Sequence, residues 1–206
     1  MTKTSSILRA ALAAITLGCL TAGAQAQLIV NGIFTDGVGS LNGWTQIDNS
    51  ANTQSPGTTY DGTSDRGRLI AGDGIYQVFG NSYTASVGDQ ITVNFELRAE
   101  WNSPSFEVVL FDSGNINNVL STSTFNLSGS FGPFTPYSIN YTAVSADVGK
   151  TVGVLFRVAG VEGDDRWGQI DNVSASVAPI PEPSTYALVA LGMGALVWLR
   201  RRARSA

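Results

Sequence analysis

Residues 91–97 read Ile-Thr-Val-Asn-Phe-Glu-Leu, and this stretch decides the fold class. Its apolar side chains occupy every second position, with Thr, Asn and Glu between them. Successive side chains of a β-strand point to opposite faces, so the pattern predicts a strand with one buried and one solvent-facing side. We therefore expect sheets that pack one face into a core.

Similar runs lie on both sides of this stretch. They predict further strands at 28–33, 44–47, 68–71, 75–79, 106–112, 137–141, 151–158 and 170–177. Turn-forming pairs such as Asp36-Gly37 and Asp61-Gly62 separate them. One helical turn is expected at 145–148, and the polar segment 49–66 is expected to be a long loop. Roughly eight to ten short strands at this spacing predict an all-β, antiparallel β-sandwich.

The first 26 residues have the features of a secretory signal peptide. Lys3 and Arg9 give a basic start, an apolar run follows at 10–20, and Ala24-Gln25-Ala26 has the small-x-small pattern that signal peptidase cuts. The run is too short for a bilayer core of about 30 Å, which disfavours a lasting anchor. Cleavage is expected before Gln27. A lipoprotein signal at Cys19 is the alternative, although the preceding residues fit a lipobox poorly.

The C-terminal end combines three features in order. The motif Pro181, Glu182, Pro183 precedes an apolar run at 184–199 and an arginine cluster of Arg200, Arg201, Arg202 and Arg204. Because proline is excluded from helix interiors, a single transmembrane helix is expected to begin after the motif. It would span about 24 Å, with the arginines held in the cytoplasm and the body outside. An amphipathic helix packed on the body is disfavoured, because the run has no polar face.

This tail resembles the PEP-CTERM sorting signal at the Pro-Glu-Pro motif, the apolar segment and the terminal arginines. The resemblance implies an exosortase-type membrane transpeptidase as partner, in a bacterium that makes exopolysaccharide. It implies transient insertion in the inner membrane, cleavage near the motif, and a destination at the cell surface or in the extracellular matrix. The chain thus divides into a signal peptide (1–26), a β-sandwich domain (27–178) and a sorting tail (179–206).

The composition of the body excludes several function classes. It carries six Lys and Arg against fifteen Asp and Glu, a net charge of −9 that disfavours nucleic acid and anionic lipid as partners. The chain has no histidine, and its one cysteine lies in the predicted signal peptide. Ser-His-Asp and Cys-His catalysis and histidine zinc sites are therefore excluded from the mature body.

Three segments of the body carry a second resemblance. They are Leu28-Ile-Val-Asn-Gly-Ile-Phe34 followed by Gly43-Trp44, then Ala146-Asp-Val-Gly-Lys-Thr-Val152, and finally Gln169-Ile-Asp-Asn-Val173. In this order they resemble carbohydrate-binding-module jelly rolls of the galactose-binding-like type. The resemblance implies two facing sheets with the first and last strands adjacent, and it places Trp44 in the core.

The same resemblance implies a structural Ca²⁺ held by an acidic residue after the opening motif and by the Asp of the closing strand. Asp171 matches the closing position, but Thr35 stands at the opening position and Asp36 follows one step later. One step along a strand turns a side chain to the other face. Asp36 and Asp171 are the candidate ligands, and the alternative is a turn-capping Asp36 with Asp171 bonded to backbone amides.

Aromatic residues with polar sequence neighbours are the candidate sugar-binding residues. Trp101 lies between Glu100 and Asn102, and Trp167 follows two aspartates and an arginine. Tyr60 and Tyr76 are further candidates. The alternative is that each ring only covers an edge of the sandwich.

Paired carboxylates are the remaining catalytic candidates, because glycosidases need two about 5–10 Å apart. Glu96 with Glu100, and Asp164 with Asp165, are the available pairs, and neither predicts a cleft. The sequence thus predicts a non-catalytic exported matrix protein with weak carbohydrate binding. A structural or adhesive matrix protein without a small ligand is the alternative, and a polysaccharide-degrading enzyme is the third, least favoured hypothesis.

Overall fold

The computed structural model describes residues 27–35, 41–60, 65–80, 83–161, 163–179, 191–195 and 200–203. Within 27–179, the described residues form ten strands and one short 3-10 helix, η1 (Ser145–Asp147). The strands are β1 (Thr45–Ile47), β2 (Gly57–Tyr60), β3 (Asp65–Ile70), β4 (Gly74–Val78), β5 (Gln90–Trp101), β6 (Ser105–Asp112), β7 (Asn115–Asn126), β8 (Thr135–Thr142), β9 (Val152–Val158) and β10 (Trp167–Ala178).

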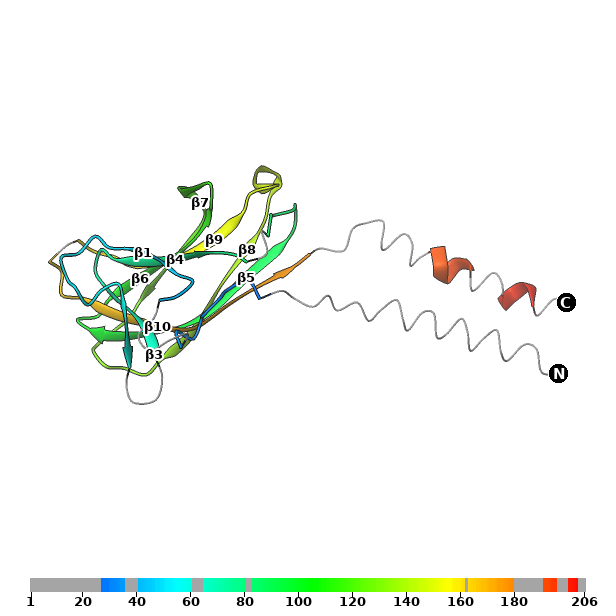
Figure 1. Ribbon diagram of the computed structural model, residues 1–206. Helices are drawn as coiled ribbons and strands as arrows, with labels where there is room; N and C mark the ends of the chain where they lie inside the picture. Colours follow the sequence, from blue (N-terminus) through cyan, green and yellow to red (C-terminus); the bar gives the residue numbers. More distant parts are fainter. Residues whose placement is uncertain are drawn as a thin grey trace.

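The strands form two five-stranded sheets that make up the body in Figure 1. Sheet A has the order β1-β4-β9-β6-β7, and sheet B has the order β2-β3-β10-β5-β8. Every strand pair is antiparallel. The prediction of an all-β, antiparallel sandwich is confirmed.

The core lies between the two sheets and follows the alternation of residues 91–97. Ile91, Val93, Phe95 and Leu97 are at most 1% exposed, while the residues between them face outward or are half-buried. Across the sandwich, the ring of Phe95 on sheet B meets that of Phe156 on sheet A edge-on, with centroids 5.1 Å apart. Full burial of such side chains contributes about 1.5–3 kcal/mol each, so this core supplies the main stabilisation. The expected burial of Trp44 is confirmed.

The predicted opening strand at 28–33 is wrong. Asn31 and Phe34 have φ angles of 52° and 53°, in the left-handed region, and the segment forms bends and turns. The side chain of Gln77 holds it instead: Oε1 accepts from Val30 N at 2.6 Å, and Nε2 donates to Val30 O at 2.9 Å. The buried side-chain amide of Gln77 on β4 thus takes the place of the backbone hydrogen bonds that a neighbouring strand would supply to Val30.

The implied adjacency of the first and last strands needs a related correction. The first strand observed, β1, belongs to sheet A, whereas β10 is central in sheet B. The opening segment itself does reach β10, because Val173 N donates to Gly32 O at 2.9 Å. A Cβ at Gly32 would lie 1.9 Å from the carbonyl oxygen of Val173, so only glycine fits this approach.

Two edge strands do not follow the sequence prediction. The segment 49–66, expected as one loop, contains β2 and the start of β3, and β7 was not predicted at all. The sequence of β7 is Asn-Ile-Asn-Asn-Val-Leu-Ser-Thr-Ser-Thr-Phe-Asn, and none of its residues is fully buried. An edge strand that buries little surface has little reason to alternate, so the period-two signal is absent. The helical turn expected at 145–148 is confirmed as η1.

The described part of the tail is helical at 191–195 and at 200–202. Within the described ranges, none of the helices has the length and apolar character needed to cross a membrane. The predicted signal peptide, the motif at 181–183 and most of the apolar run at 184–199 lie outside those ranges.

Candidate functional site

The two longest paired strands, β5 and β10, define two ends of the sandwich. They run antiparallel, with Trp101 opposite Trp167 at one end and Gln90 opposite Ala178 at the other. We call these the far end and the tail end, because the chain leaves β10 at Ala178 toward the sorting tail. Twelve residues per strand separate the ends by roughly 36 Å at about 3.3 Å per residue. In Figure 1 the orange strand β10 runs from the far end on the left to the tail end on the right.

The far end carries an exposed aromatic pair, Trp101 and Phe131. Trp101 is 45% exposed and Phe131 is 62% exposed, and their ring centroids lie 5.8 Å apart at an interplanar angle of 71°. Trp101 ends β5, while Phe131 lies in the connection between β7 and β8. Exposed rings of this size are unfavourable in water and mark interaction sites when they gather.

Backbone and hydroxyl groups fix the loops that carry the aromatic pair. Ser103 N donates to Gly129 O at 3.0 Å, and Gly129 N donates to the Ser103 hydroxyl at 2.9 Å. Asn102 N also donates to the Ser130 hydroxyl at 3.2 Å. The two loops are therefore joined by the residues next to the two rings in sequence, so the aromatic pair needs little ordering on binding.

Trp167 lies beside Trp101 in the sheet but is only 6% exposed. The Arg68 guanidinium stacks over its ring at 3.9 Å from the centroid, and Asp165 accepts from its indole nitrogen at 2.8 Å. Arg68 in turn pairs with Glu100 at 2.8 Å. Trp167 therefore forms part of a covered support next to the aromatic pair, with its indole face and N–H already engaged.

Of the two tyrosine candidates, Tyr76 lies away from the aromatic pair, and the side chain of Tyr60 is outside the described residues. Tyr76 is on β4 of sheet A, where its ring packs edge-on against Phe111 at 5.6 Å in a small outer apolar cluster. Tyr60 ends the edge strand β2 of sheet B, and its side chain lies outside the described residues. The structure thus brings Trp101 and Trp167 together and separates Tyr76 from them.

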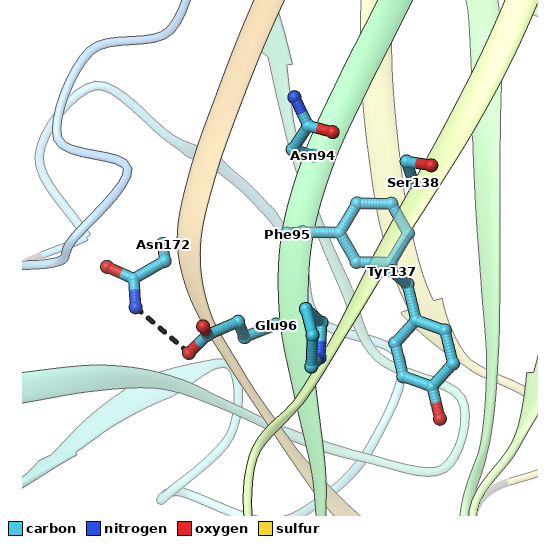
Figure 2. A pocket seen from close by; sticks show the side chains of 7 residues that line it. Asn94, Phe95, Glu96, Tyr137, Ser138 and Asn172 are labelled. Atoms are coloured by element: carbon cyan, nitrogen blue, oxygen red, sulfur yellow. Dashed lines mark hydrogen bonds between the residues drawn. The ribbon is translucent and has the colours of Figure 1, made fainter.

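A hollow of about 340 Å³ lies further along the outer face of sheet B, and the sequence did not predict it. It is lined by Asn94, Phe95, Glu96, Pro136, Tyr137, Ser138 and Asn172. Figure 2 shows Glu96 and Asn172 pointing toward each other, with Asn172 Nδ2 donating to Glu96 Oε2 at 2.9 Å. Asn172 sits at a bulge in β10 with a φ of 52°, a conformation that Asn tolerates better than most residues. The adjacent polar residues Asp171 and Asn172, between the apolar residues Ile170 and Val173, were the available signal in the sequence.

The predicted calcium ligands stay a prediction. Asp36 lies outside the described residues, and Asp171 is 7% exposed with Oδ1 accepting from Asn172 N at 2.7 Å. The part of the chain that the structure describes holds no group of three or more Asp, Glu, His or Cys side chains suited to a metal ion.

The carboxylates considered for glycoside hydrolysis are each engaged with a neighbour. Glu96 and Glu100 share one face of β5 but are four residues apart, roughly 13 Å along a strand, which exceeds the spacing that either glycosidase mechanism uses. Glu100 pairs with Arg68, and Asp164 pairs with Arg166 at 2.6 Å. Glu100 and Asp164 thus each form an ion pair at the far end, while Glu96 bonds to Asn172 in the hollow.

Comparison with known protein families finds one match, to the PEP-CTERM protein-sorting motif at residues 179–203. The sequence matches no curated protein.

Several solved structures are similar in fold. A cyclase from Fischerella sp. TAU gives a TM-score of 0.60 at 14% identity, covering 77% of this chain and 100% of the cyclase. The N-terminal cellulose-binding domain of Cellulomonas fimi β-1,4-glucanase C gives 0.50 at 14% identity, covering 76% and 100%. An arabinose-bound α-L-arabinofuranosidase, MgGH51, gives 0.50 at 14% identity, covering 75% of this chain and 27% of the enzyme.

At this identity the likeness is one of fold alone, and the three proteins differ in what they do. The two resemblances predicted from the sequence are nevertheless confirmed. The chain carries a PEP-CTERM protein-sorting motif at residues 179–203, and its body is a two-sheet β-sandwich whose structural neighbours include carbohydrate-binding modules of jelly-roll-like fold.

Proposed function

We propose that this chain is an exported, non-catalytic protein of the cell surface or exopolysaccharide matrix that binds extracellular polysaccharide weakly. The observation that carries the binding proposal is the aromatic pair, in which Trp101 and Phe131 are both exposed at the far end. The sorting motif at 179–203 carries the proposal of surface delivery by an exosortase-type transpeptidase.

The chemistry around the aromatic pair suits a sugar ring. The C–H face of a pyranose is flat and apolar and stacks on an aromatic ring, while its hydroxyls exchange hydrogen bonds with amides and hydroxyls. Asn102, Ser103 and Ser130 are exposed and lie in the loops that hold the rings. An open, shallow platform buries little ligand surface, so each sugar unit is expected to bind weakly, with avidity arising from repeated contacts on a polymer.

The placement of the aromatic pair supports this assignment. The pair lies roughly 36 Å from the tail end, as the lengths of β5 and β10 require. The chain leaves the sandwich at the tail end, so an anchored protein would present the far end away from the membrane.

The delivery route adds the finer steps. Signal peptidase removes residues 1–26, the apolar run at 184–199 crosses the inner membrane transiently, and the exosortase-type enzyme cuts near Pro181-Glu182-Pro183. Mass spectrometry of protein recovered from cells and matrix tests this route. A mature form that begins at Gln27 and ends near Pro181 is expected, whereas a dominant species that retains Arg200–Ala206 contradicts removal of the tail.

A glycan array and tryptophan fluorescence test the sugar site. The full chain is expected to bind one polysaccharide class with a change in emission, and the double change Trp101→Ala, Phe131→Ala is expected to weaken binding about tenfold, the equivalent of about 1.4 kcal/mol. Val161→Ala is the matched control, because Val161 is 70% exposed at the same end and lies outside the pair. Equal binding by all three proteins contradicts the site.

One observation favours the alternative, a structural or adhesive matrix protein without a small ligand. The edge strand β7 presents exposed Asn and Thr side chains, among them Asn117, Thr122 and Thr124, which form an uncharged polar surface. A flat response across the glycan array, together with normal recovery of the protein from the matrix, would favour this alternative.

A further inference from the structure

Two β-turns at the tail end each present a valine to solvent. In the turn at 147–150, Val148 has φ −55° and ψ 127°, Gly149 has φ 79°, and Lys150 N donates to Asp147 O at 3.0 Å. These values define a type II turn, with Val148 in the position where proline is common. The turn at 86–89 is built alike, with Gly88 at φ 86° and Asp89 N donating to Ser86 O at 3.1 Å.

The two turns lie side by side because backbone hydrogen bonds join them. Gly149 N donates to Ala85 O at 2.9 Å, and Gly88 N donates to Ala143 O at 2.8 Å. Three exposed valines, Val87, Val144 and Val148, which are 62%, 52% and 59% exposed, therefore lie in neighbouring segments at the tail end. We call these three residues the valine patch. Nothing in turn chemistry requires an apolar side chain at these positions.

The charges near the valine patch are distributed unlike those of the body as a whole. Residues 83–90 and 142–151 contain two carboxylates, Asp89 and Asp147, and these are 7% and 3% exposed. Asp89 accepts from the Tyr83 hydroxyl and Ser86 N, and Asp147 accepts from the Tyr141 hydroxyl, Val144 N and Lys150 Nζ. Lys150, whose side chain is 23% exposed and whose ammonium pairs with Asp147, is the most exposed charged residue in these two segments. An acidic body with a net charge of −9 therefore shows no exposed carboxylate there.

The valine patch also lies where the chain leaves the domain. Gln90, which follows the turn at 86–89, pairs with both Ala178 and Thr142. In Figure 1 the end of β10 and the connection between β8 and β9 lie on the same side of the body. Five residues, 179–183, separate Ala178 from the apolar run at 184–199, a reach of at most about 18 Å.

We propose that the valine patch rests on a phospholipid surface, the outer leaflet of the inner membrane, while the sorting tail is inserted. The proposal rests on the proposed insertion of the tail. Transfer of the apolar valine side chains from water into the interfacial region of the bilayer is favourable. Because the carboxylates of Asp89 and Asp147 are buried, they do not present a negative surface that anionic lipid headgroups would repel. The short connection raises the effective concentration of the patch at the membrane, so that weak contact is sufficient. This contact orients the domain with its far end outward.

Depth-dependent fluorescence quenching of the full chain in vesicles of phosphatidylethanolamine and phosphatidylglycerol tests the proposal. Cys19→Ser removes the native thiol, and single cysteines at Val148, Ser130 or Met193 carry an environment-sensitive fluorophore. Ser130 marks the far end and Met193 marks the tail. Lipids with a nitroxide at a shallow acyl position are expected to quench the probe at Val148, and lipids with a nitroxide deep in the acyl chain are expected to quench the probe at Met193. The probe at Ser130 is expected to stay bright with both.

Each other result has a distinct meaning. Quenching at Met193 without quenching at Val148 overturns the seating of the patch and leaves tail insertion standing. A bright probe at Met193 overturns tail insertion, and the seating with it. Equal quenching at Val148 and Ser130 overturns the seating, because it shows undirected adsorption. Quenching at Val148 that requires an added membrane protein assigns the patch to a protein partner and also overturns the lipid proposal.

A charge-insertion variant completes the test. With the probe at Val148, the double change Val87→Asp, Val144→Asp is expected to abolish quenching, because carboxylates are strongly disfavoured at the apolar boundary. Val161→Asp, at the far end, is the matched control and is expected to keep it. Thermal unfolding in the absence of vesicles verifies that the variants remain folded, and persistent quenching in the folded double variant overturns the proposal.

Discussion

The far end and the tail end of the sandwich are built from the same strands but carry opposite surfaces. At the far end, Trp101 and Phe131 are exposed beside the ion pairs Arg68–Glu100 and Arg166–Asp164. At the tail end, three valines are exposed and two carboxylates, Asp89 and Asp147, are turned inward. The rings and charges suit a hydroxylated polymer in water, whereas the valines suit a lipid boundary.

This difference shows that the loops, and not the sheets, determine the surface chemistry of each end of the sandwich. The core between the sheets is continuous along β5 from Ile91 to Leu97 and does not distinguish one end from the other. The end surfaces come from connections whose sequence is free of core packing, so each can be changed without the other. The predictions below use that independence.

The largest effect is expected from a change between the two ends. In Gly32→Ala, a Cβ would lie 1.9 Å from the carbonyl oxygen of Val173 and 2.9 Å from its carbonyl carbon, so the clash is with backbone that has little room to relax. We expect a loss of about 3 kcal/mol in the free energy of unfolding, the upper end of the range of about 1–3 kcal/mol that overpacking typically costs. Urea unfolding measures it, and a wild-type midpoint would contradict the close approach.

The next largest effect is a difference between the two ends in how much stability is lost when one carboxylate is replaced. Asp147→Asn at the tail end weakens hydrogen bonds from Tyr141, Val144 and Lys150 to a buried carboxylate, and we expect a loss of about 2 kcal/mol. Asp164→Asn at the far end removes a partly exposed ion pair and is expected to cost less than about 1 kcal/mol. Thermal unfolding of both variants gives the ranking, and equal losses would remove the distinction.

The same tail-end group predicts the pH dependence. Burial on its own would raise the pKa of Asp147, but the hydrogen bonds from Tyr141, Val144 N and Lys150 outweigh it, and the pKa is lowered. The contribution of Asp147 is therefore present above the unfolded pKa, near 4, and is lost as the pH falls through the lower folded value.

Tyr141 is expected to limit stability at alkaline pH, as Asp147 does at acidic pH. Burial and its bond to Asp147 raise its pKa from 10.0 to about 12, so its contribution is complete below pH 10 and is lost as the pH rises toward 12. Stability measured by urea unfolding across this range should fall at both extremes, and Asp147→Asn should flatten both falls. A variant that keeps both falls unchanged would contradict the assignment.

The smallest effect on folding is expected at the valine patch. Val87→Ser and Val148→Ser change exposed turn positions and should alter the free energy of unfolding by less than about 0.5 kcal/mol. The same changes are expected to reduce association of the full chain with vesicles in flotation experiments. Unfolding that shifts as strongly as in Asp147→Asn would mean that the valines serve the fold instead.

The sequence predicted strands whose apolar residues mark a buried face and missed two edge strands that lack an alternating apolar pattern. Ile91 to Leu97 alternate because one face packs into the core, but β2 and β7 are edge strands with little to bury. The opening segment reads as a strand from its apolar residues, yet the left-handed conformations of Asn31 and Phe34 and the amide of Gln77 decide its course. These tertiary contacts override the local preference for a strand, and the local sequence pattern does not reveal them.

The candidate site was predictable in kind and only partly in detail. Trp101 and Trp167 have similar polar neighbours in sequence, and only the position of Arg68 over Trp167 separates an exposed ring from a covered one. Phe131 was missed because its partner lies thirty residues earlier in the chain, and the hydrogen bonds between Ser103 and Gly129 that join the loops are not visible in local sequence.

Affinity electrophoresis through gels containing the exopolysaccharide of the producing cells tests the division of labour between the ends most directly. The wild-type chain and the variant Val87→Asp, Val144→Asp are expected to be retarded equally, while Trp101→Ala, Phe131→Ala is expected to migrate as in a gel without polysaccharide. Retardation that survives loss of both rings, or that disappears with the valines, would contradict the account.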